Sequence, residues 1–225
     1  MPHVELPKAT FAQELLAAKR TTHMDLNGSM YFHESIVPPL AEEHTVEYLN
    51  CGTQKVVFVH PNDSSKVVTA EYWNSAPSIH KQTYYLHSIF NSIWPHNIPH
   101  VFAAGKTSGE KPIAWSIRQR IVEQEAKEQI PNIIYPFDHL MAVTARYEIP
   151  FMYDTYSSNF IVGTNGGEYY VDDLDIFKYL PLNTIVDLAK TKNLPADVEE
   201  RLVANVIQFN HLMHDSWEEF AITAR

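Results

Sequence analysis

The segment YEIPFMYDTYSSNFIVGTNGGEYYVDD spans residues 147–173 and contains the clearest structural signal in the chain. Two short runs of aromatic and β-branched residues, at 160–162 and 169–171, flank the turn sequence Asn165-Gly166-Gly167. Runs of this kind on either side of an Asn-Gly turn are typical of a β-hairpin. The sequence therefore predicts two short strands joined by a tight turn.

Polar residues stand just outside both strands of this expected hairpin. Asp154 and Asn159 come before the first strand, and Asp172 and Asp173 follow the second. One interpretation is structural, because Asp and Asn are common turn residues and Asp154 and Asp172 would then only cap a loop. The other is functional, because the hairpin brings carboxylate and amide oxygens to one end.

Patterns of hydrophobicity on both sides of the segment predict a mixed α+β chain. Three β-rich runs, one amphipathic helix and two further β-rich runs come before it, at 45–49, 55–60, 66–73, 78–93, 100–104 and 113–122. Helices are expected at 10–20, 137–146, 182–190 and 196–223. Residues 21–43 are expected to be irregular, with a turn at Asn27-Gly28.

A five-stranded unit with one helix after its third strand, followed by a helical half with a short hairpin, resembles protein kinases and aminoglycoside-phosphotransferase-like kinases. The resemblance covers about residues 44–180. It implies an α+β, kinase-like two-lobed fold, with a five-stranded antiparallel N-lobe carrying one helix and a reduced helical C-lobe. The expected divisions are an N-terminal helical extension at 1–43, the N-lobe at 44–123 and the C-lobe at 124–225.

The resemblance also implies roles for the polar residues around the hairpin. Asp154 and Asn159 have the spacing of the family's catalytic Asp and magnesium-binding Asn. The second magnesium-binding residue falls at Asp172, with Asp173 nearly as good a match. Magnesium prefers such hard oxygen ligands.

Other positions depart from the pattern of active kinases. Residues 49–58 resemble the loop over the nucleotide phosphates, but only its middle glycine, Gly52, is kept. The third-strand lysine would fall at Thr69 or Tyr72, and neither is cationic. No Asp or Glu occurs at 72–109, so the following helix cannot supply the partner glutamate. Phosphoryl transfer depends on positioning and charge, so these losses predict a pseudokinase.

Composition narrows the classes of function. Among 225 residues the net charge is -10, which argues against general binding to nucleic acid or to an anionic membrane surface. The single cysteine, Cys51, excludes a disulfide framework, and no apolar run approaches the roughly 18 residues of a membrane span. These features favour a cytoplasmic protein without membrane insertion.

The expected function is that of a catalytically inactive, kinase-like adaptor or scaffold that binds protein partners in a cytoplasmic assembly. Bacterial secretion and effector systems are the analogous setting. The last helix offers Met213, Trp217 and Phe220 as a partner surface, unless the helix at 10–20 covers it. No cofactor is expected. The alternative is a small ATP- and magnesium-dependent phosphotransferase that uses Asp154, Asn159 and Asp172, and the third possibility is an unrelated α+β protein.

Overall fold

The computed structural model describes part of the chain. The described residues are 23–24, 30–31, 47–51, 55–60, 62–71, 79–106, 114–124, 145–146, 149, 159–174 and 179–223. The expected helix at 10–20 lies outside them, as does the helix at 137–146 except for its last two residues. The chain divides into two compact units, one made of 1–84 and 101–120, the other of 85–100 and 121–225.

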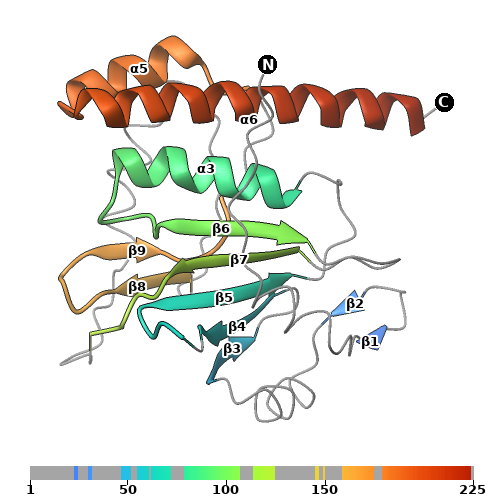
Figure 1. Ribbon diagram of the computed structural model, residues 1–225, viewed down its shortest axis with the longest axis vertical. Helices are drawn as coiled ribbons and strands as arrows, with labels where there is room; N and C mark the ends of the chain where they lie inside the picture. Colours follow the sequence, from blue (N-terminus) through green and yellow to red (C-terminus); the bar gives the residue numbers. More distant parts are fainter. Residues whose placement is uncertain are drawn as a thin grey trace. The chain divides into compact units, whose positions relative to one another are not determined.

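The first unit contains a five-stranded antiparallel sheet in the order β3-β4-β5-β7-β6 (Figure 1). The strands are Tyr48–Cys51 (β3), Lys55–Val59 (β4), Lys66–Glu71 (β5), Val101–Lys106 (β6) and Ala114–Gln119 (β7). Helix α3, Ile79–Ile93, lies between β5 and β6 in the sequence. The predicted α+β class and the predicted order of strands and helix are therefore confirmed.

A short strand pair precedes this sheet. Strand β1, His23–Met24, pairs with β2, Met30–Tyr31, in antiparallel register. The prediction that residues 21–43 are wholly irregular is therefore wrong. The signal was the Asn27-Gly28 turn sequence, which favours the pairing of the residues that flank it.

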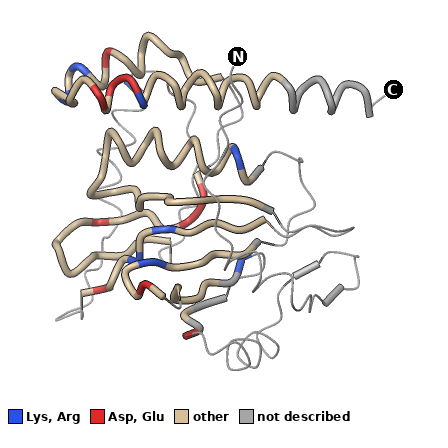
Figure 2. The backbone as a smooth tube through the Cα atoms, in the orientation of Figure 1, with Lys and Arg blue, Asp and Glu red and all other residues tan. Residues whose placement is uncertain are grey.

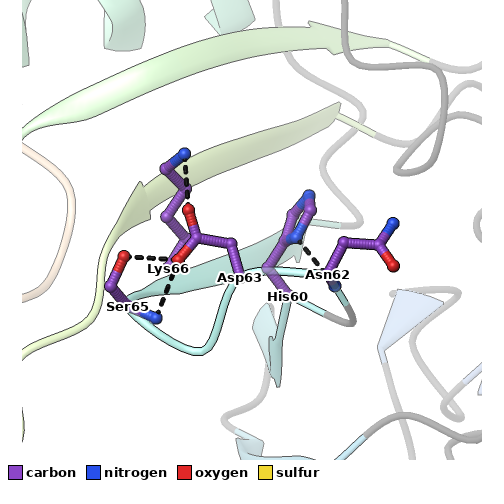
Figure 3. A network of polar contacts seen from close by, with 5 residues as sticks. All are labelled: His60, Asn62, Asp63, Ser65 and Lys66. Atoms are coloured by element: carbon purple, nitrogen blue, oxygen red, sulfur yellow. Dashed lines mark hydrogen bonds and ion pairs between the residues drawn. The ribbon is translucent and has the colours of Figure 1, made fainter.

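The turn between β4 and β5 is held by the side chain of Asp63 (Figure 3). Its Oδ1 accepts hydrogen bonds from the Ser65 backbone N–H, at 3.1 Å, and from the Ser65 hydroxyl. Its Oδ2 lies 2.7 Å from Lys66 Nζ. The hydrogen bond with Lys66, followed by those with Ser65, lowers the pKa of Asp63 to about 2. Lys66 is the first residue of β5, so the contacts of Asp63 stabilise the turn directly before this strand.

A close approach of backbone and aromatic ring lies between β6 and β7. Gly105 is the register partner of Trp115, which is buried. A Cβ atom at residue 105 would lie 2.5 Å from Trp115 Cζ2, well inside van der Waals contact. The indole ring therefore covers the glycine, and any side chain at this position must displace the ring.

The second unit contains two packed helices, α5, Leu182–Thr191, and α6, Ala196–Thr223, which run side by side in Figure 1. Asn193 has φ 52°, the left-handed conformation that commonly ends a helix, and reverses the chain between them. Among the side chains that the structure describes in this pair, the buried ones are Ile185, Leu188, Ala189, Leu202, Val206, Phe209 and Met213. The predicted bounds of α6 are confirmed.

We expect Gly105→Ala to destabilise the protein by about 1–3 kcal/mol, the usual cost of an added group in a packed site. Urea denaturation measures this change in the free energy of unfolding. In a Trp115→Phe background the same substitution should cost less, because the smaller ring leaves space for the methyl group. Equal costs in the two backgrounds would contradict the assigned contact.

Candidate functional site

The hairpin predicted from the 147–173 segment is present. Strand β8, Phe160–Val162, pairs with β9, Glu168–Tyr170, so the second strand begins one residue earlier than expected. Gly166 has φ +76° in the turn, a backbone conformation that residues with a side chain rarely adopt. Asn165 closes the turn, since its Oδ1 accepts from the Gly167 N–H and its Nδ2 donates to the Tyr169 hydroxyl.

Both edges of the hairpin carry further backbone hydrogen bonds. Along β8, Gln124 N donates to Val162 O at 2.8 Å and Thr164 N donates to Val122 O at 2.9 Å. Along β9, Tyr170 N donates to Asn97 O at 2.8 Å, and Asn97 Nδ2 donates to Glu168 O at 3.0 Å. Each strand of the hairpin is therefore hydrogen-bonded to a neighbouring segment, β8 to residues 122–124 and β9 to Asn97.

The open end of the hairpin carries two of the predicted polar residues. Val171 N donates to Asn159 O at 2.9 Å, which extends the ladder one step beyond β8 and β9. Asn159 thus lies across from Val171, and Asp172 is the next residue along the chain. Both side chains are partly exposed. Asp154, the third predicted residue, lies outside the described part of the chain, as does Gly52.

Asp173 has a different environment from Asp172. Its Oδ1 lies 3.6 Å from Nε2 of His87, a fully buried residue on α3. Its backbone oxygen accepts a hydrogen bond from the Tyr170 hydroxyl at 3.3 Å. No local sequence pattern marks His87, because it stands 86 positions before Asp173 in the chain.

A chain of buried polar groups occupies the centre of the five-stranded sheet. Thr69 and Ser116 are register partners whose hydroxyl oxygens lie 2.6 Å apart in a hydrogen bond. Arg118 Nε donates to the same Ser116 oxygen at 2.8 Å. The exposed fractions of Thr69, Ser116 and Arg118 are 3%, 3% and 2%. This Thr69–Ser116–Arg118 chain therefore places a buried guanidinium close to one of the two positions considered for the third-strand lysine.

Helix α3 contributes no carboxylate to this region. Its sequence contains no Asp or Glu, and Figure 2 shows no acidic residue along it. Tyr72, the other position considered for the lysine, lies outside the described residues. Among the residues that the structure does describe, no group of three or more His, Cys, Asp or Glu side chains is placed to hold a metal ion.

The residues expected to form a partner surface on α6 divide into two groups. Met213 is 7% exposed and belongs to the buried stripe of the helix, so it contributes to packing within the chain. The side chains of Trp217 and Phe220 lie outside the described part. The partner-surface hypothesis therefore depends on these two residues.

Comparisons with known proteins give no relative for this chain. No protein-family model matches the sequence, and no curated protein is significantly similar to it. None of the described helices is long and apolar enough to cross a membrane.

We expect Ser116→Ala to destabilise the protein by about 1–3 kcal/mol, because Arg118 Nε and the Thr69 hydroxyl lose their shared partner in a buried site. Thr69→Val, which leaves the bond between Ser116 and Arg118, should cost less. Chemical denaturation of both variants measures the difference in the free energy of unfolding. A larger cost for Thr69→Val would contradict the central place of Ser116 in the chain of polar groups.

Proposed function

We propose that this chain is a catalytically inactive, kinase-like protein that acts as an adaptor in a protein assembly. The order of elements supports the kinase-like part of the proposal. Three strands, helix α3, two strands, the β8–β9 hairpin and helices α5 and α6 follow one another as the resemblance implies. Asn159 and Asp172 also stand at the hairpin end where that plan places its magnesium ligands.

The observation that carries the inactive assignment is the Thr69–Ser116–Arg118 chain. Active kinases hold the α- and β-phosphates with a lysine from the third strand. At Thr69 the side chain is a buried hydroxyl bonded to Ser116, and cross-strand partners share one face of a sheet. A lysine at this position would bring a second buried cation close to the Arg118 guanidinium, which carries a large electrostatic penalty.

The lack of acids in α3 supports the same conclusion. The usual lysine is oriented by a glutamate from this helix, and α3 offers only Lys81 as a charged residue. The residues present therefore do not fit a bound triphosphate in the ordinary kinase manner. ATP and magnesium are not part of the proposed function.

A second candidate function rests on the neighbouring positions of Asn159 and Asp172. The ladder that ends at Asn159 O pairs this residue with Val171, so Asp172 stands one position further along, at the hairpin end where the resemblance places a magnesium site. In this alternative the chain is a small phosphotransferase, with Asp154 as the base and a cation from elsewhere in place of the missing lysine.

The adaptor role is proposed for a cytoplasmic complex of the kind found in bacterial secretion and effector systems. Trp217 and Phe220 continue the apolar stripe of α6 beyond the buried Met213. Large apolar groups at the end of such a stripe favour contact with a protein partner.

Thermal unfolding with and without millimolar ATP and magnesium tests the inactive assignment. We expect no magnesium-dependent change in melting temperature. A ligand present at 100 times its dissociation constant would add about 2.7 kcal/mol, or roughly 5–10 °C for a chain of this size. A shift of that size in the wild type that disappears in Asn159→Ala and Asp172→Ala would support the phosphotransferase instead.

Partner binding tests the adaptor role. We expect Trp217→Ala to weaken the recovery of protein partners by affinity purification, because it removes a large apolar contact. Asp172→Ala should leave recovery unchanged, since the proposed function does not use a metal at the hairpin. The opposite pattern, with recovery lost only in Asp172→Ala, would overturn the assignment of the partner surface to α6.

A further inference from the structure

We propose that His87 and Asp173 form a lock that holds helix α3 against the segment following β9 without the help of any ligand. His87 lies in the second half of α3, and its side chain is fully buried. Its Nε2 lies 3.6 Å from Asp173 Oδ1, within ion-pair range. A buried imidazole is costly without polar contacts, so the carboxylate stabilises this position of the helix.

His87 Nε2 and Asp173 Oδ1 lie within ion-pair range but too far apart for a hydrogen bond, so the attraction between them is electrostatic. Asp173 keeps 20% of its side chain exposed, which reduces the cost of leaving its carboxylate charged. The lock therefore combines the fully buried imidazole of His87 with the partly hydrated carboxylate of Asp173.

Asp173, the second residue of the lock, is also hydrogen-bonded to the hairpin through its backbone. The Tyr170 hydroxyl donates to Asp173 O, and Tyr170 N donates to Asn97 O. Asn97 stands four residues after the end of α3 at Ile93, and its side chain donates to Glu168 O. The β9 segment is thus in contact with His87 inside α3 and with Asn97 in the turn after it, so movement of the helix along this segment would disturb at least one of these contacts.

The His87–Asp173 contact differs from the ion pair that the kinase resemblance implies for this helix. In active kinases, the position of the corresponding helix depends on an ion pair with the strand lysine, and that pair changes with regulation. Here His87 of α3 faces Asp173, and this contact needs no nucleotide. The inference goes beyond the proposed adaptor function and stands even if nucleotide binding is found.

Hydrogen exchange of the full-length chain tests the lock, with Asp173→Ala compared against Asp172→Ala. Both variants remove one carboxylate from adjacent positions, and Asp173→Ala keeps the backbone bond to Tyr170. We expect Asp173→Ala to speed exchange in residues 85–93 by roughly tenfold, as lost contacts to a charged group allow easier local opening. Asp172→Ala should change exchange there by less than about twofold.

His87→Leu completes a double-mutant cycle with Asp173→Ala. If the two side chains act on each other, the double variant exchanges no faster than the faster single variant. Additive effects, or equal effects of Asp173→Ala and Asp172→Ala, would overturn the proposal. If His87→Leu does not fold, the matched pair of aspartate variants still decides the question. Nucleotide-induced thermal shifts are a separate measurement, so the lock and the inactive assignment can fail independently.

Discussion

A guanidinium that is 2% exposed must find its hydrogen bonds inside the protein, and this constraint shapes the centre of the five-stranded sheet. Arg118 satisfies part of this requirement by donating to the Ser116 hydroxyl oxygen, and the Ser116 hydroxyl is also hydrogen-bonded to Thr69 on the neighbouring strand. The three groups stand on one face because cross-strand partners and alternate residues share a face. The polar chain is therefore consistent with one register of β5 against β7, in which Thr69 lies opposite Ser116.

The same constraint limits the chemistry that this sheet can support. A charged side chain added beside Arg118 would need its own hydration or counter-ion, and a site as buried as Thr69 supplies neither readily. The hydrogen-bonded hydroxyls of Thr69 and Ser116 therefore suit this buried position better than a charged side chain would. The hairpin end is different, because the side chains of Asn159 and Asp172 are partly exposed there.

The sequence predicted the elements better than the contacts between them. Helix α6 and strand β8 begin and end where their apolar patterns indicate, because each pattern is local and covers the whole element. Strand β3 begins at Tyr48 and not at Thr45, since the end of a strand depends on its partner as well as on its own residues.

The site shows the same division. The neighbouring positions of Asn159 and Asp172 could be predicted, because a single hairpin joins them. Arg118 left a weak signal, because it is the one charged residue of β7, but its meaning depends on the register with β5. The contact between His87 and Asp173 had no signal, because only the folded chain brings α3 to the segment after β9.

A histidine–aspartate contact also constrains a helix differently from a lysine–glutamate pair. A lysine reaches its partner through a flexible four-carbon stem, so the pair tolerates movement of the backbone that carries it. The His87 ring is one methylene away from the backbone of α3, and Asp173 is equally short. A displacement of the helix therefore changes the distance between the His87 ring and the Asp173 carboxylate, because neither side chain is long enough to compensate for it. A helix in contact through two such short side chains is therefore constrained more closely than one held by a lysine–glutamate pair.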